Sequence, residues 1–399
     1  MSIVENKSEE LFKELCSQQY LKGFVFHSPK YNDPTEKEAG DVVLWIRDNL
    51  IVFEIVWRNP SSDISTKSFI RRVSEKRKQL ENDFIAYRDK QIILVNEEGK
   101  TVEYGKDNFL DRNFSGIIIV DSDVELECIH KESYKRTLVN GFPIAVMTKN
   151  DFEDLLIEID TVPDLSYYLK DRYNFLKNIY SLCPDIFINL NIRTERNLIA
   201  LYKKKSNKFD SYTCKDLLEE NIWDSYREEF REKIEIRDKE NEQTNIIDNL
   251  IDVLLKNPSY DEIRPLHAWE LGLLSRRERV TFSDKVNGAL VYSKKESRQF
   301  AYFNSNTSCW IVFYFQYNSQ RESLLDNLQN MTNLKLIKEI KEESFEYSVF
   351  GYGFHVSSDE PEIALIIEDA DNIQEIEGTR YEESLKYFGK PQAEKIKEW

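Results

Sequence analysis

The sequence has few of the residues that build disulfide frameworks, zinc sites or phosphate-binding loops. Its five cysteines and four histidines are scattered singly along 399 residues, without the paired spacing that either kind of site requires. Only twelve glycines are present, and they form neither a GxxxxGK(S/T) loop nor a GxGxxG turn. The sequence therefore gives no support for a disulfide scaffold, a zinc centre or a Gly-rich nucleotide loop.

Long apolar segments are also missing. Apolar runs such as Gly116 to Val120 and Ile363 to Ile367 are far shorter than the ~20 residues that a membrane helix needs. The first seven residues, Met1 to Lys7, lack the basic, apolar and small-residue order of a signal peptide. Together with the odd number of dispersed cysteines, these features predict a soluble cytoplasmic protein with no membrane partner.

The charge is strongly acidic and unevenly distributed. A formal net charge of −17 argues against a surface coated for nucleic-acid binding, although it allows a local basic cleft. The segment from Lys341 to Trp399 holds fifteen acidic and six basic residues, so it carries much of the excess. This acidic C-terminal region is a candidate surface for a protein partner, and a plain solvated surface is the alternative.

Helix and strand patterns alternate in the first part of the chain. Ser8 to Tyr20 reads as a helix, with Ser8 as its N-cap and leucines on one face. Gly23 to His27 reads as a short strand. Asp41 to Arg47 and Leu50 to Trp57 are β-branched and aromatic runs separated by Asp48 and Asn49, which predicts a β-hairpin.

The pattern then changes to a helical period over Ser65 to Lys90. Three further strands are expected, at Ile92 to Val95, Gly116 to Val120 and Pro143 to Met147, and Asn150 or Asp151 begins another helix. This alternation predicts an α/β fold in which a mixed sheet is flanked by helices.

The remaining chain divides into two further parts. Residues 165–243 are helical and densely charged, which is typical of a solvated connector. Residues 244–399 begin with helices to Lys256 and around His267 to Arg276, and strands follow. The expected strands are 308–316, 345–356 and 361–368, with a helix near 320–329. We therefore expect three parts, residues 1–164, 165–243 and 244–399, the last being a C-terminal α+β domain.

Two carboxylates on the predicted hairpin are candidates for chemistry. Asp41 opens the first strand, and Glu54 interrupts the otherwise apolar second strand. Burying an unpaired carboxylate is costly, so Glu54 needs a cation or a partner. Metal-dependent phosphodiester cleavage requires hard oxygen ligands for Mg²⁺ and a group that orients a water molecule. A structural ion pair at Glu54, with Asp41 simply ending a turn, is the alternative.

This order of elements and carboxylates resembles the PD-(D/E)XK, or restriction-endonuclease-like, superfamily. The resemblance covers about the first 150 to 165 residues and rests on the αβββαβ order of the helix, strand, hairpin, basic helix and buried strand. It implies a restriction-endonuclease-like core that binds Mg²⁺ or Mn²⁺ and hydrolyses DNA, in a setting of bacterial anti-phage defence. The implied residues are Glu10 (with Glu14 as an alternative), Asp41 and Glu54 as metal ligands, Gln79 as the polar residue of the following helix, and Lys76 and Arg77 as phosphate contacts.

The sequence departs from the superfamily pattern at the lysine position. Two residues beyond Glu54, on the same strand face, stands Val56, which can neither orient a water nor stabilise negative charge on phosphorus. Arg58 lies on that face two residues further along and is a candidate catalytic cation. Lys67 and Lys76 on the following helix are the other candidates for this migrated role.

Three hypotheses follow. The first is an enzyme, a Mg²⁺-dependent endonuclease or exonuclease acting on DNA. The second is a catalytically inactive nuclease-like module that binds nucleic acid or a protein partner, and Val56 favours it. The third is that the C-terminal domain senses a ligand or partner and gates the first domain. The sequence is compatible with an oligomer.

Overall fold

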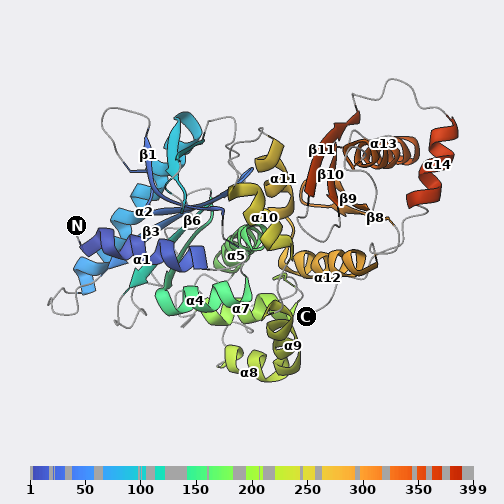
Figure 1. The fold of residues 1–399 in the computed structure, drawn as a ribbon. Coiled ribbons are helices and arrows are strands. Elements are labelled where there is room, and N and C mark those ends of the chain that lie inside the picture. The colour runs from blue at the N-terminus through green and yellow to red at the C-terminus, as the bar shows by residue number, and fades with distance from the viewer. Residues whose placement is uncertain are drawn as a thin grey trace. The chain divides into compact units, whose positions relative to one another are not determined.

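The structure is a computed structural model, and the chain divides into two compact units, residues 1–236 and 237–399 (Figure 1). It describes residues 3–17, 21, 23–31, 38–57, 66–97, 99, 101–104, 113–121, 142–159, 161–182, 195–205, 207–209, 221–242, 246–256, 263–292, 297–316, 324–343, 348–355, 362–370 and 378–388. Within these residues, no helix combines the length and the apolar character needed to cross a membrane.

A seven-stranded mixed sheet forms the centre of the first unit. Its order is β5-β4-β1-β2-β3-β6-β7. The strands are β1 (Val25–Tyr31), β2 (Val42–Ile46), β3 (Asn49–Trp57), β4 (Ile92–Val95), β5 (Thr101–Tyr104), β6 (Phe114–Asp121) and β7 (Ile144–Thr148). Neighbouring strands are antiparallel from β5 to β3, and β6 and β7 run parallel to β3. The predicted mixed sheet and the β2–β3 hairpin are confirmed, while the sequence pattern missed β5.

Helices cover both faces of this sheet. The helices of the first unit are α1 (Ile3–Ser17), α2 (Thr66–Asp89), α4 (Lys149–Glu158), α5 (Val162–Leu182), α7 (Glu195–Lys204) and α8 (Ile222–Glu229), and α9 (Arg231–Glu242) crosses the division between the units. Phe53 and Glu54 are adjacent on β3, so their side chains point to opposite faces. Phe53 packs against Phe152 of α4, whereas Glu54 contacts Lys76 of α2. The two faces are therefore covered by different helices (Figure 1).

The start of the first helix differs from the prediction. Helix α1 begins at Ile3, so Ser8 lies inside the helix and is not its N-cap. Ile3 and Val4 extend the apolar pattern towards the N-terminus, and a serine in a helix is tolerated at small cost. Phe12 of α1 packs against His27 of β1, with 4.5 Å between the ring centroids. This contact places α1 on the face of Phe53, because His27, Val42 and Phe53 are successive partners across β1, β2 and β3.

The charged region that we expected to be a connector contributes to the first unit as far as residue 236. Helix α5 buries Leu165, Tyr168 and Leu169 and contacts the sheet. The guanidinium of Arg172 on α5 donates two hydrogen bonds, of 2.6 and 2.9 Å, to the carboxylate of Glu195 on α7. Both side chains are almost completely buried. Charges in this segment therefore join helices to each other instead of forming only a solvated surface.

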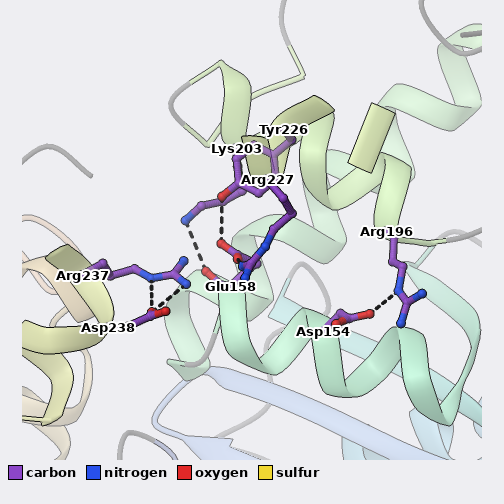
Figure 2. Close-up of polar contacts among 8 residues, drawn as sticks. All are labelled: Asp154, Glu158, Arg196, Lys203, Tyr226, Arg227, Arg237 and Asp238. Carbon is purple, nitrogen blue, oxygen red and sulfur yellow. Dashed lines mark hydrogen bonds and ion pairs between the residues drawn. The ribbon is translucent and has the colours of Figure 1, made fainter. Parts of the chain in front are cut away.

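A second polar network joins α4, α7 and α8 (Figure 2). The buried carboxylate of Glu158 on α4 accepts hydrogen bonds from the hydroxyl of Tyr226, at 2.9 Å, and from Arg227, at 3.2 Å. Nearer the start of α4, Asp154 pairs with Arg196 of α7. Helix α8 is thus held to α4 by contacts between residues that are far apart in the sequence.

The second unit is the expected α+β domain, and its sheet has the order β11-β10-β9-β8. Its strands are β8 (Arg298–Asn304), β9 (Cys309–Gln316), β10 (Ser348–His355) and β11 (Glu362–Asp369). Its other helices are α10 (Ile246–Lys256), α11 (Ile263–Gly272), α12 (Arg276–Tyr292), α13 (Leu324–Glu343) and α14 (Gly378–Phe388). Strands β9 and β10 are parallel, and α13 connects them and packs on the sheet.

Helix α12 occupies residues where we expected strands to begin. Its apolar periodicity is weak, and a buried arginine fixes it instead. Arg279 forms a 2.7 Å ion pair with Asp248 of α10 and donates to the carbonyl oxygens of Gly272 and Leu274. Such tertiary contacts override a weak local pattern and are not visible from a window of sequence.

Gly351 gives a test of the α13–sheet packing. A Cβ atom at Gly351 would lie 2.4 Å from Cγ2 of Thr332 and 2.6 Å from Cγ2 of Ile366, which is too close for packed side chains. We expect Gly351→Ala to lower the free energy of unfolding by about 1–3 kcal/mol. The control is Gly288→Ala, because Gly288 lies within α12 with open space around it and should gain about 0.5–1 kcal/mol. Urea unfolding of the full chain measures both, and equal effects would contradict this packing.

Asp151 in the first turn of α4 gives a pH-dependent test. Burial raises the pKa of Asp151 from 3.8 to about 6, and the nearby Glu195 adds to this effect. Because its pKa is higher in the folded than in the unfolded protein, protonated Asp151 favours the folded state. This contribution to the free energy of unfolding is fully present below pH 3.8 and is lost as the pH rises through 6. Asp151→Asn, which cannot ionise, should therefore gain stability over the wild type between pH 4 and 7, by up to about 3 kcal/mol. Urea unfolding of the wild type and of Asp151→Asn at pH 4 and at pH 7 measures the gain in stability. A gain of the same size at both pH values would contradict the prediction.

Candidate active site

Asp41 is fixed at the start of β2, opposite Glu54 of β3. Its backbone N–H donates to the carbonyl oxygen of Phe53 at 2.9 Å. Its carboxylate oxygen Oδ2 accepts a 2.7 Å hydrogen bond from the backbone N–H of Ile55. The side chain thus takes the place of a carbonyl acceptor at the point where the β2–β3 ladder ends. One hydrogen bond through the backbone of Asp41 and one through its carboxylate, both with β3, leave the side chain little freedom.

Gly40 makes this arrangement possible. It has a φ of +104°, in a region that residues with a Cβ atom rarely adopt. A Cβ atom at this position would also lie 2.4 Å from Cγ1 of Val52. Glycine therefore allows the chain to turn tightly against β3 and to present Asp41 beside Glu54.

Lys76 of α2 joins the two carboxylates. Its ammonium group forms an ion pair with Oε2 of Glu54 and lies 3.3 Å from Oδ2 of Asp41. Glu54 is completely buried and Asp41 is 9% exposed, whereas the side chain of Lys76 is 22% exposed. The three charged groups form one cluster on the face of the sheet that α2 covers.

The buried stripe of α2 sets the position of Lys76. The stripe consists of Val73, Lys76, Leu80, Asp83 and Tyr87, of which Lys76 alone is partly exposed. Leu80 lies against Gly116 of β6, where a Cβ atom would be 2.8 Å from Cδ1 of Leu80. The hydroxyl of Tyr87 donates to the carbonyl oxygen of Ala39 at 3.0 Å. These contacts hold the part of α2 that follows Lys76 close to the sheet.

Burial and the neighbouring charges set the electrostatics of the cluster. Burial and the charge of Asp41 raise the pKa of Glu54 well above its ordinary range, and Lys76 opposes this rise. Burial lowers the pKa of Lys76, but the carboxylates of Glu54 and Asp41 raise it by more, so its net shift is upward. The second carboxylate oxygen of Glu54, Oε1, is buried and accepts no hydrogen bond from the residues that the structure describes. Among these residues, this oxygen of the cluster still lacks a partner.

Asp83 is a fourth charged residue that the sequence reasoning missed. It is 1% exposed and its charge contributes to the raised pKa of Glu54. Its position seven residues after Lys76 places both on the same face of α2. An aspartate at a core position of a helix was the available signal, and it was hidden by the many charges of this helix.

The structure does not bring all the predicted residues together. Glu10 is exposed and pairs with Lys7 at 2.9 Å, and its alternative Glu14 lies 3.7 Å from Lys149. Arg77 is partly buried on α2 and pairs with Glu81, at 2.9 Å.

The structure describes some of the other predicted residues and leaves Arg58 out. Gln79 is partly buried on α2, one turn after Lys76. Val56 is buried on β3, as the pattern indicated, and Lys67 lies in α2, although its side chain is outside the described residues. Arg58 lies outside the described residues altogether.

The donor set suits a hard divalent cation with only two protein ligands. Within the described part of the chain, no three or more His, Cys, Asp or Glu side chains are grouped to hold a metal. Mg²⁺ is nevertheless commonly held by one or two carboxylates, with water and substrate phosphate completing its shell. Asp41 and Glu54, with the unpartnered Oε1 of Glu54, meet this lower requirement.

Comparisons with known proteins do not extend this picture. No family model, no curated protein and no solved structure matches the chain. The interpretation of the site therefore rests on the residues themselves.

The ion pairs of Lys76 predict a large stability effect. Lys76→Met would leave Glu54 buried with Asp41 and without a compensating charge, which typically costs ~3–5 kcal/mol for a buried pair. Lys76→Arg is the matched control, because it keeps a cation on a side chain of similar reach. Urea unfolding at neutral pH measures both variants. A methionine variant as stable as the arginine variant would show that the pairs contribute nothing to stability.

Proposed function

We propose that this protein is a divalent-metal-dependent nuclease that hydrolyses phosphodiester bonds of DNA. The observation that carries the proposal is the convergence of Asp41, Glu54 and Lys76 on one face of the sheet. Two carboxylates and one ammonium group, partly open to solvent, are the residue types that this chemistry needs. None of the three is close in sequence to both of the others, so the fold assembles them.

Asp41 and Glu54 are the residues that would hold Mg²⁺ or Mn²⁺. When bound, such a cation supplies a Lewis acid for the phosphoryl oxygen and lowers the pKa of a bound water. Asp41 is oriented for this role by Ile55, and Glu54 by its place in the strand. Both carboxylates would keep their positions, because the sheet backbone fixes them.

Lys76 takes the role that Val56 cannot perform. Its ammonium reaches the carboxylates from α2, so a cation is present beside Glu54 although the strand carries none. In the proposed reaction it orients the attacking water or stabilises the negative charge that develops on phosphorus. Sequence reasoning named Lys76 both as a phosphate contact and as a candidate for this migrated cation.

The order of elements also supports the proposal. The chain contains, in order, a helix (α1), an antiparallel three-stranded meander (β1–β3), a second helix (α2) and a strand parallel to the last strand of the meander (β6). Strands β4 and β5 lie between α2 and β6 in the sequence. The resemblance to the PD-(D/E)XK superfamily rests on this order. Glu10 is left out of the proposed site, because it pairs with Lys7 at the surface. The anti-phage setting remains a prediction of the resemblance.

An inactive nuclease-like module is the second candidate. The specific observation in its favour is that Lys76 already compensates both carboxylates, so the cluster is stable as an internal ion-pair network. Such a module would bind nucleic acid or a protein partner without cleaving anything. It predicts that replacing Asp41 leaves that binding unchanged.

Cleavage assays with two carboxylate variants separate these functions. The wild-type protein should cleave DNA in the presence of Mg²⁺ or Mn²⁺, and Asp41→Asn should reduce the rate roughly 100-fold or more. Glu75→Gln is the control, because Glu75 is an exposed residue of α2 that pairs with Arg71. It should retain full activity. Fluorescent DNA and RNA oligonucleotides report the rate and the preferred substrate.

The opposite result is equally clear. If the folded wild-type protein cleaves no DNA or RNA with any of several divalent metals, the inactive module is the better account. If Asp41→Asn cleaves as fast as the wild type, the reaction does not take place at this site.

A further inference from the structure

Lys76 occupies the space in which a metal ion would have to bind. Its ammonium contacts Oε2 of Glu54 and Oδ2 of Asp41, which are the oxygens that the proposed cation would share. The carboxylates of Asp41, Glu54 and Asp83 and the ammonium of Lys76 together carry a formal charge of −2. Oε1 of Glu54 has no hydrogen-bond partner among the described residues.

A divalent cation and the ammonium group therefore compete for the same carboxylate oxygens. Glu54 is completely buried, so solvent and salt screen the repulsion between the two cations poorly. Asp41 and Glu54 cannot separate to hold both cations, because strand pairing and the Ile55 hydrogen bond fix them. The arrival of one cation must weaken the contacts of the other.

Lys76 is the member of the cluster that can move. Its side chain is 22% exposed, and four rotatable methylene groups carry the ammonium. The buried stripe residues Leu80 and Tyr87 hold α2 on the sheet without its help. The ammonium can thus turn towards solvent while the helix stays in place.

We propose that metal binding displaces the ammonium of Lys76 from the carboxylates and converts it into a binding group for a phosphodiester anion. The inference rests on the proposed function and specifies how its site is controlled. With a divalent cation in place, the formal charge of Asp41, Glu54, Asp83 and Lys76 changes from −2 to 0. The site then no longer repels the backbone of a nucleic-acid strand and the released ammonium can bind it, so metal and phosphodiester bind cooperatively through Lys76.

Metal affinity in Lys76 variants tests the competition directly. Calorimetric titration with Ca²⁺ is suitable, because its readout is binding and needs no catalysis. We expect Lys76→Gln to bind Ca²⁺ about tenfold or more tightly than the wild type, which corresponds to about 1.4 kcal/mol. Lys76→Arg, which keeps the competing charge, should bind Ca²⁺ as the wild type does. Equal or weaker Ca²⁺ binding by Lys76→Gln would overturn the proposal.

The cooperativity can be measured in the wild-type protein as well. Fluorescence anisotropy of a short labelled DNA duplex, with and without Ca²⁺, gives the coupling between the two ligands. We expect Ca²⁺ to tighten DNA binding by the wild type about tenfold, and by Lys76→Gln only a few-fold. The same gain in both proteins, or no gain in the wild type, would contradict the proposal. The wild-type measurement decides the matter if the glutamine variant does not fold.

Asp41→Asn separates this inference from the proposed function. If Ca²⁺ binding requires Asp41 but is unchanged by Lys76→Gln, the proposed metal site is supported. The proposed displacement of Lys76 by the metal is then wrong. If wild type and Lys76→Gln bind no Ca²⁺ or Mn²⁺ through Asp41, the proposed function itself fails.

Discussion

The buried carboxylate of Glu54 is the constraint around which the first unit is organised. It lies in a strand that is otherwise apolar, in the middle of a sheet covered by helices on both faces. An ionised carboxylate in such a place requires a compensating charge. Lys76 provides this charge, and α2 must therefore lie where its side chain can reach β3. The requirement of one side chain thus connects the hairpin, the helix and the candidate site.

The same constraint explains how the site combines stability with chemistry. A carboxylate pair close to one ammonium is stable in the absence of any ligand, because each charge has a partner. It is also incomplete, because one oxygen of Glu54 remains without a hydrogen bond. A structural role and the proposed catalytic role make opposite demands on Lys76. The partial exposure of its side chain is the feature that allows both.

Sequence patterns predicted the parts of the fold that depend on local periodicity. The hairpin of β2 and β3 followed from β-branched alternation, and α2 followed from its helical stripe. The pair Asp41 and Glu54 could be singled out because a charge within an apolar strand is costly. The helix α12 was missed because Arg279 stabilises it through Asp248, which is 31 residues away in the sequence. The role of Asp83 was overlooked among the many charges of α2, and the ion pairs of Lys76 depend on tertiary packing, which decides which charges of a basic helix face the sheet.

A substitution at Gly40 would disturb this site although the residue carries no functional group. The positive φ of Gly40 and its contact with Val52 decide where the carboxylate of Asp41 is presented. A single-base change at this codon would leave every charged residue of the cluster in the gene while moving one of them in space. Loss of the proposed activity would then arise from a position that carries no functional group.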